Sequence, residues 1–156
     1  MTPRLKVWEV APEMMQAFSD FSIAQAKDGL EHSLQELVKI RASQLNGCAF
    51  CLHMHSLEAR KAGESELRLL MLPAWRESPL FTARERAALA WTESLTRLSE
   101  THAPDEDYAE LAFEFTPEEQ VKLTMLICNI NAWNRFGAGF RAVHAGHPPV
   151  EAKEAA

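Results

Sequence analysis

The sequence predicts an all-α protein, a bundle of about six to seven helices. Apolar residues recur at helical spacing in several long segments. Paired signals for a helix start occur twice, at Thr82 with Glu85 and at Thr116 with Glu119. No segment alternates apolar and polar residues as a half-buried strand does. With 156 residues, 47% of them hydrophobic, the chain is long enough for one domain with a substantial core.

The first half of the chain divides into three predicted helices, each ended by a glycine signal. Pro12 suits the start of the first helix, and Asp28-Gly29 would end it. Asn46-Gly47 interrupts the leucine pattern of the second helix, and Gly63 suits a left-handed cap on the third. The expected ranges are 13–27, 30–45, and from the Asn46-Gly47 break to Gly63.

The second half begins with a short helix that runs into Pro73, followed by an irregular connection. Later helices are expected over 66–72, from Thr82 to about 98, over 105–113 and over 117–143. The last of these is apolar on nearly every side in its middle, so it is expected in the centre of the bundle. Gly137 and Gly139 would bend it or let another helix approach closely. The single domain is expected to cover 1–146, with a mobile tail at 147–156.

Charge and hydropathy exclude several classes of partner. The net charge is −6 and basic residues are scattered among acidic ones, which gives no electrostatic case for nucleic acid or an anionic membrane. Residues 1–10 contain no signal-peptide pattern, and Lys122 and two asparagines break the apolar stretch at 121–133, which is too short to span a bilayer. A soluble cytoplasmic protein is therefore expected.

The pattern that carries chemistry is Cys48-Ala-Phe-Cys51, followed four residues later by His55. Three cysteines make a poor structural disulfide framework, so a cycling dithiol is the better interpretation. The break before Cys48 places both thiols in the first turns of a helix, where free backbone N–H groups favour a thiolate. His55 can accept the proton of Cys51, and Cys48 is close enough to attack an oxidised Cys51.

Two other interpretations of this segment remain open. Buried cysteines are often inert, so the helix could carry two unreactive thiols and a surface histidine. Alternatively, Cys48, Cys51, His53 and His55 could hold zinc. Zinc sites usually draw a second ligand pair from farther along the chain, and two histidines two residues apart point in different directions on a helix.

The segment from Glu36 to His55 resembles the alkylhydroperoxidase AhpD-like, or carboxymuconolactone decarboxylase-like, family. The matching positions are Glu36, Cys48, Cys51 and His55, joined by the late stretch Ile130-Asn131-Ala132-Trp133-Asn134-Arg135. The helical pattern extends the resemblance over residues 13–143. The resemblance implies an AhpD-like helical fold that assembles as a homo-oligomer, a trimer or a hexamer.

The resemblance also implies reduction of alkyl hydroperoxides or hydrogen peroxide through a dithiol–disulfide cycle. Cys51 would attack the peroxide, Cys48 would resolve the oxidised thiol, and His55 with Glu36 would relay protons. Phe50 stands where a family pattern has histidine, which removes one activator of Cys48. The scheme needs no organic cofactor and no metal, and its reductant would be an external dithiol such as a lipoylated or thioredoxin-like protein.

Two functions from other classes compete with a peroxidase. A lactone decarboxylase would use His55 and Glu36 without the thiols, as the decarboxylase branch of the family implies. A non-enzymatic helical oligomer would use the dithiol only to sense oxidation. The cysteine pair favours the peroxidase.

Several remaining residues have structural interpretations. Cys128 lies in an apolar helix and is expected to be buried and unreactive. His53 is expected at a surface or interface, and His32 has no assigned role. Trp91 and Trp133 would be core or interface aromatics, or would line an apolar pocket. The polar residues of the late helix are expected to tie helices together or to cross a subunit interface: Asn131, Asn134 and Arg135.

Overall fold

The computed structural model describes residues 2–27 and 29–146, and every regular element within them is a helix. The all-α prediction is confirmed. In chain order the elements are α1 (Val7–Val10), α2 (Pro12–Gln25), α3 (His32–Asn46), α4 (Ala49–Lys61), α5 (Glu66–Met71), the 3-10 helix η1 (Leu72–Ala74), α6 (Ala83–Thr96), α7 (Leu98–Thr101), α8 (Asp105–Glu114) and α9 (Pro117–Gly139). Asp28 and the predicted tail at 147–156 lie outside the described residues.

The described part of the chain contains more helices than the six to seven expected, because a single helical turn leaves no periodic pattern in the sequence. The helices α1 and α7 are one turn long, and only Arg97 separates α7 from the end of α6 at Thr96. The strong boundary signals are confirmed. Thr82 and Thr116 both form reciprocal capping boxes, and Gly47 ends α3 in the left-handed conformation at φ 65°.

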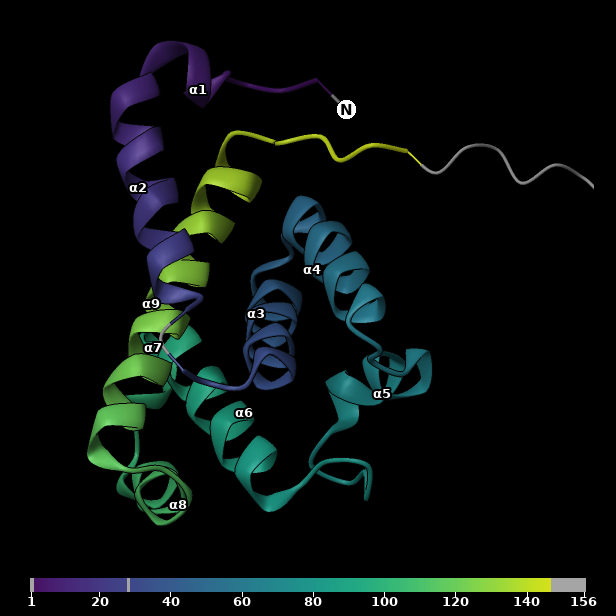
Figure 1. The fold of residues 1–156 in the computed structure, drawn as a ribbon, viewed down its shortest axis with the longest axis vertical. Coiled ribbons are helices and arrows are strands. Elements are labelled where there is room, and N and C mark those ends of the chain that lie inside the picture. The colour runs from purple at the N-terminus through teal and green to yellow at the C-terminus, as the bar shows by residue number, and fades with distance from the viewer. Residues whose placement is uncertain (1, 28, 147–156) are drawn as a thin grey trace, which may run out of the picture.

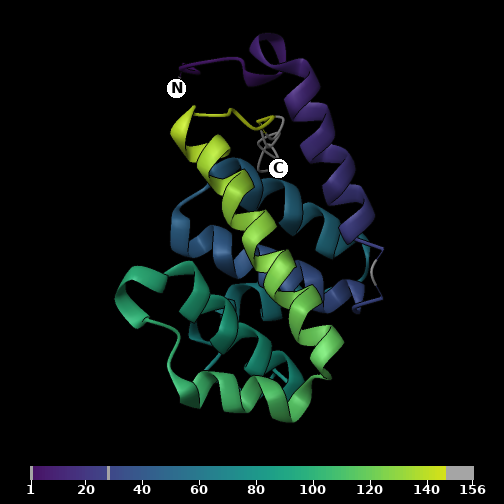
Figure 2. The same cartoon turned by 90° about the vertical axis from the view of Figure 1, so that its left-hand side faces the viewer.

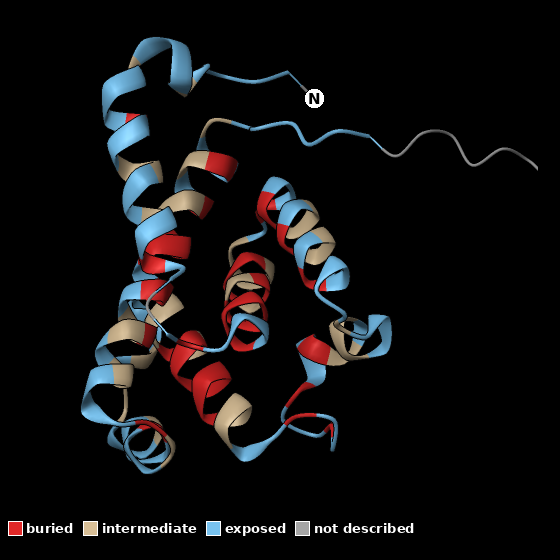
Figure 3. Cartoon of the chain, viewed as in Figure 1, coloured by how far each residue is buried: buried red, intermediate tan, exposed pale blue. Residues whose placement is uncertain are grey.

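The helix α3 lies in the middle of the molecule, where it packs against α4, α6 and α9 (Figure 1). Much of its length is buried (Figure 3). The helix α9 crosses the bundle diagonally (Figure 2) and also contacts α2 and α8. The prediction that α9 is surrounded on all sides is wrong, because one of its faces is open to solvent. On that face the side chains of Val121 and Met125 are 65% and 44% exposed. A helix whose sequence is apolar on every face is therefore not necessarily the helix that the others surround.

Polar side chains fasten α9 to the C-terminal end of α3. The amide of Asn46 donates 2.9 Å hydrogen bonds to the side-chain oxygens of Asn131 and Asn134. Asn134, which is only 1% exposed, donates in turn to the hydroxyl of Ser43 over 2.9 Å. Arg135 stays exposed and donates to the carbonyl of Asn131 within its own helix. The expectation that the two asparagines tie helices together is confirmed, and the tie lies directly before Cys48.

Three groups of buried residues fill the bundle. Trp91 belongs to the largest group, between α3, α6, α8 and α9, so it is a core aromatic. A small third group surrounds the thiols, with Ala42, Cys48, Cys51 and Ile130 buried and Trp133 packed against them. No helix in the described ranges is both long enough and apolar enough to cross a bilayer.

Candidate dithiol active site

The two predicted redox cysteines lie side by side at the start of α4. Cys48 and Cys51 form a disulfide, with their Cα atoms 5.4 Å apart. Cys48 is the N-cap residue of the helix and Cys51 lies in its first turn. Both are almost completely buried, at 1% and 2% exposed. The structure therefore places the pair close enough to interconvert between dithiol and disulfide.

The N-terminus of α4 is directed at the sulfur of Cys48. The backbone N–H of Cys51 donates to Cys48 Sγ over 3.4 Å, as an N-cap side chain accepts from the first turn. Such a hydrogen bond, together with the positive end of the helix dipole, favours a thiolate over a thiol. A Cys48 thiolate that kept this position after reduction would be stabilised by the same contact.

His55 and Glu36 form a buried pair between α4 and α3. His55 Nδ1 lies 2.9 Å from Glu36 Oε2, and Lys39 Nζ donates to Glu36 Oε1 over 2.8 Å. Burial opposes ionisation of Glu36, which is 1% exposed, but the hydrogen bonds and charges of His55 and Lys39 outweigh burial and lower its pKa. Glu36 is therefore an ionised carboxylate in the interior.

A second carboxylate reaches the same imidazole nitrogen. Glu58 Oε2 lies 3.2 Å from His55 Nδ1, and its side chain is half exposed. Burial works to lower the pKa of His55, but the hydrogen bonds to Glu36 and Glu58 outweigh it and raise the pKa above 6.5. The two carboxylates therefore favour the protonated form of His55, which suits this side chain to proton transfer.

The ring geometry assigns different tasks to the two nitrogens of His55. Nδ1 is occupied by the carboxylates, so Nε2 is the nitrogen available for proton exchange with a reacting group. No hydrogen bond joins His55 to either sulfur within the described part of the chain, where the sulfurs are bonded to each other. His55 follows Cys51 by one helical turn in α4, the spacing at which two side chains share a face.

The four residues of the alternative zinc interpretation are not gathered around a common centre in the described residues. Of the four proposed ligands, only His55 belongs to a group that could hold a metal, and its companions there are Glu36 and Glu58. Their ligand atoms lie within 4.8 Å of one another. Lys39 already contacts Glu36 and balances its charge, which disfavours a further cation.

An apolar cavity of about 540 Å³ lies beside the relay. His55, Lys39 and Glu58 form a polar part of its wall. Phe50 and Trp133 contribute aromatic surface, which confirms the pocket-lining interpretation of Trp133. Apolar side chains complete most of the remaining wall: Trp8, Ile23, Met54, Leu126 and Ile130. Neither Cys48 nor Cys51 is among the residues that line this cavity, so His55 is the member of the site that borders it.

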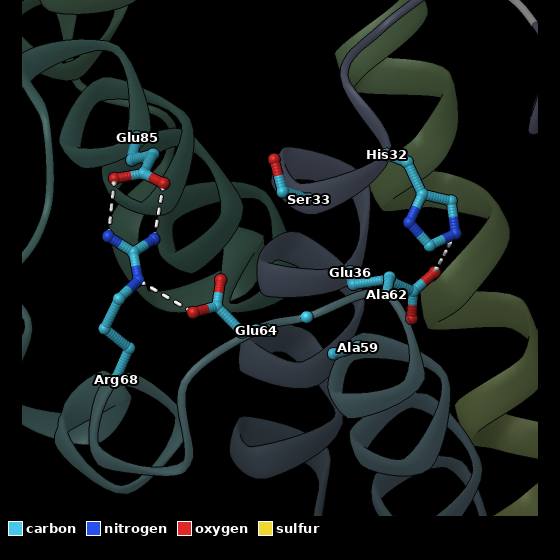
Figure 4. Close-up of a pocket in the computed structure, with 9 residues that line it drawn as sticks. His32, Ser33, Glu36, Ala59, Ala62, Glu64, Arg68 and Glu85 are labelled. Atoms are coloured by element: carbon cyan, nitrogen blue, oxygen red, sulfur yellow. Dashed lines mark hydrogen bonds and ion pairs between the residues drawn. The ribbon is translucent and has the colours of Figure 1, made fainter.

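A smaller cavity of about 210 Å³ lies at Glu36 (Figure 4). His32 Nε2 lies 3.9 Å from Glu36 Oε1 at the edge of this cavity, so the structure places this unassigned histidine next to the His55–Glu36 pair. Across the cavity Arg68 pairs with Glu64 and Glu85, at 2.9 and 2.5 Å. Glu36 lines the small cavity and His55 the large one, so the pair spans the wall between them.

Two residues near the site, Lys39 and Glu58, have no role in the sequence prediction. Lys39 follows Glu36 by three positions and Glu58 follows His55 by three, so helical spacing alone could have indicated both. The expected close approach at Gly137 is confirmed, because this residue of α9 packs directly against the two sulfurs, whereas Gly139 has no such neighbour. His53 is half-buried and stacks on His144 with ring centroids 4.6 Å apart, away from the relay.

The expectation that Cys128 is buried is wrong, because its thiol is exposed. Cys128 shares the outer face of α9 with Val121 and Met125, and the described helices leave this face uncovered. We expect a thiol reagent such as Ellman's reagent to modify one thiol per chain in the folded disulfide form, and none in Cys128→Ser. If Cys128 reacts only after denaturation, another copy of the chain covers this face.

Comparison with known sequences identifies the family. A profile of the Carboxymuconolactone decarboxylase family matches residues 12–94, which include Glu36, both redox cysteines and His55. The chain therefore belongs to this family, and the resemblance predicted from the site motif is confirmed. The protein class defined by fold and site is an AhpD-like helical protein with a disulfide-bonded Cys-x-x-Cys pair.

Relatives confirm the fold over nearly the whole chain. The uncharacterised protein YdfG of Bacillus subtilis (strain 168) is 39% identical over 135 residues, covering 86% of this chain and 92% of YdfG. The crystal structure of ATU0492 from Agrobacterium tumefaciens has a TM-score of 0.91 and 41% identity, covering 94% of this chain and all of that one. ATU0492 is a protein of unknown function for which a role as the antioxidant defence protein AhpD has been suggested.

A more distant structure shares the fold alone. The debrominase Bmp8, crystallised as a cysteine-to-alanine variant in complex with 2,3,4-tribromopyrrole, is 19% identical, with a TM-score of 0.76. The match covers 86% of this chain and 72% of Bmp8.

Proposed function

We propose that the protein is a thiol peroxidase that reduces hydroperoxides through Cys48 and Cys51. The observation that carries the proposal is the cysteine pair at the N-terminus of α4, one turn before a buried His55–Glu36 pair. Such a cycle needs three groups: a thiol that ionises to attack the peroxide, a second thiol close enough to form the disulfide, and a proton donor for the leaving group.

The first half of the cycle consumes the peroxide. The Cys51 thiolate attacks the terminal oxygen, an S–O bond forms and the O–O bond breaks, and Cys51 becomes a sulfenic acid. The leaving alkoxide takes a proton from His55 and departs as an alcohol, or as water when the substrate is hydrogen peroxide. Glu36 keeps Nδ1 hydrogen-bonded throughout, which orients the ring and stabilises its charged form.

The second half restores the dithiol. The Cys48 thiolate attacks the sulfur of Cys51, the S–S bond forms and hydroxide leaves, protonated to water. An external dithiol then supplies two electrons, reduces the disulfide and becomes a disulfide itself. A lipoylated or thioredoxin-like protein would fit this role, as the family resemblance implies.

The large cavity supports an organic substrate. Its aromatic and aliphatic walls bury apolar surface, at about 25 cal/mol for each Å² removed from water. Phe50 lines the cavity at the position where the related pattern has histidine, so this wall is apolar here. We therefore expect an alkyl or aryl hydroperoxide to react with a higher kcat/KM than hydrogen peroxide.

Stopped-flow mixing of the pre-reduced protein with cumene hydroperoxide tests the proposal. One equivalent of hydroperoxide should disappear per chain without any other reductant, and Cys48 and Cys51 should become a disulfide at the same rate. The pre-oxidised protein is the control and should consume none. Unchanged hydroperoxide after mixing with the fully reduced protein would contradict the proposal.

Proton-transfer chemistry on a lactone acid is a second candidate, as the family name suggests. The specific observation in its favour is the cluster of His55 with Glu36, Glu58 and Lys39, which needs no sulfur to move a proton. Such a reaction should tolerate Cys48→Ser and Cys51→Ser, whereas the peroxidase should not.

We also propose that the protein acts as a homo-oligomer, a trimer or a hexamer. The family resemblance supports this, and so do large apolar side chains left exposed on α2 and α9, including Met14 at 74% and Val121 at 65%. Sedimentation velocity should give a mass three or six times that of the chain. A monomer at micromolar concentration would contradict the prediction.

A further inference from the structure

The helix α9 passes the cysteine pair at Gly137, with no side chain between them. A Cβ atom built on Gly137 would lie 2.5 Å from Cys48 Sγ and 3.3 Å from Cys51 Sγ. The first separation is far shorter than a carbon–sulfur contact, so the sulfur or the helix would have to move. The backbone of Gly137 is ordinary helix, so glycine is required here by space and not by φ.

The helix is held in place and cannot retreat freely. Asn134, about one turn before Gly137, forms hydrogen bonds with the side chains of Ser43 and Asn46 at the end of α3. Moving α9 outward would break these bonds and leave buried amide groups unsatisfied. The flexible partner at this contact is the side chain of Cys48.

We propose that Gly137 is a positioning residue for the redox pair, which supplies the space that Cys48 Sγ occupies in the disulfide. In the disulfide, Cys48 Sγ is covalently tied to Cys51 and cannot leave the position next to Gly137. In the dithiol, the sulfur is released and can rotate about the Cα–Cβ bond of Cys48. A methyl group at position 137 therefore costs more in the oxidised state than in the reduced state.

The affected reaction is thiol–disulfide exchange. An external dithiol gives two electrons and two protons, the Cys48–Cys51 bond breaks, both cysteines become thiols and the external dithiol becomes a disulfide. Gly137→Ala should shift this equilibrium towards the dithiol. The relevance to catalysis rests on the proposed peroxidase cycle, but the equilibrium itself is measured without peroxide.

The test is redox equilibration of Gly137→Ala in buffers of reduced and oxidised dithiothreitol, with the fraction of disulfide read by mass spectrometry after thiol trapping. Gly139→Ala is the matched control, because it lies in the same helix and a Cβ there has no neighbour within 4 Å. Gly137→Ala should change the equilibrium constant at least tenfold towards the dithiol, which corresponds to about 30 mV for two electrons. Gly139→Ala should match the wild type.

A second pair of variants separates this effect from general damage to the bundle. In the Cys48→Ala background the nearer sulfur is gone, and Cys51 Sγ, 3.3 Å from the added Cβ, is no longer tied by a disulfide and can rotate away. Gly137→Ala should therefore leave the melting temperature unchanged or raise it. In the oxidised wild-type background the same substitution should lower the melting temperature.

Two results would overturn the proposal. The first is an unchanged redox equilibrium in Gly137→Ala. The second is an equal loss of stability from Gly137→Ala whether or not Cys48 is present. Because neither measurement involves peroxide, an inactive peroxidase with a shifted equilibrium would reject the proposed function and keep this inference.

Discussion

Cys51→Ser is expected to abolish hydroperoxide turnover, lowering kcat on the order of 10³-fold or more, as loss of a nucleophile does. A serine hydroxyl does not ionise near neutral pH, so it cannot attack the peroxide oxygen. The geometry supports Cys51 as the attacking thiol because His55 follows it by one turn of α4. The measurement is steady-state consumption of cumene hydroperoxide with dithiothreitol as reductant.

Cys48→Ser is the matched control and should separate attack from resolution. It should consume one equivalent of hydroperoxide in a single burst, form a trappable sulfenic acid on Cys51, and then stop. The hydrogen bond from the Cys51 N–H to Cys48 Sγ makes this control necessary, because it favours a thiolate on Cys48. If Cys51→Ser kept the burst and Cys48→Ser lost it, Cys48 would be the attacking thiol and Cys51 the resolving thiol.

Glu36→Gln is expected to lower kcat/KM on the order of 10²-fold, within the range that general acid–base groups contribute. The substitution keeps the size of the side chain but removes one of the two carboxylate charges that raise the pKa of His55. Burial then lowers the pKa of His55, so the limb of the pH–rate profile that reports this histidine should move to lower pH. Measuring kcat/KM for cumene hydroperoxide between pH 5 and 9, in steps of roughly one unit, tests both effects.

The same substitution should destabilise the folded disulfide form by up to about 3–5 kcal/mol, because Lys39 loses its carboxylate partner and His55 keeps only the half-exposed Glu58. Ionised Glu36, with its lowered pKa, contributes stability above about pH 4.5, and that contribution is lost as the pH falls through its folded pKa. Protonated His55, with its raised pKa, contributes below about pH 6.5, and that contribution is lost as the pH rises through its folded pKa. The difference between wild type and variant in urea unfolding should be greatest between these two values.

Glu64→Gln is the control for Glu36→Gln. Glu64 is also largely buried, lines the same small cavity and pairs with Arg68 at 2.9 Å, but it does not contact His55 (Figure 4). The Glu64→Gln variant should therefore be less stable than the wild type, but its pH–rate profile should not shift. A shift of equal size in both variants would show that the profile reports general damage and not the relay.

Most of the fold could be predicted from the sequence because helix boundaries depend on neighbouring residues. The capping boxes at Thr82 and Thr116 and the left-handed turn at Gly47 are formed within a few residues of the chain. The prolines before α6 likewise indicate its irregular connection. Single-turn helices such as α1 could not be predicted, because four residues are too few for a periodic pattern.

The sequence by itself determined the chemical parts of the site and their local spacing. Cys48, Cys51 and His55 are within eight positions, so one helix is enough to arrange them. The position of Glu36 followed from a family pattern, and the structure brings its carboxylate to His55.

Only the tertiary structure decided which groups from other helices meet these parts. It shows that Gly137 of α9 leaves room for the sulfur of Cys48, that the outer face of α9 exposes Cys128, and that α3 is the enclosed helix. Periodicity shows that a helix has an apolar face, whereas the packing of several helices decides which face is covered and which atoms lie opposite one another. These contacts join residues far apart in the chain, so no short segment of sequence contains them.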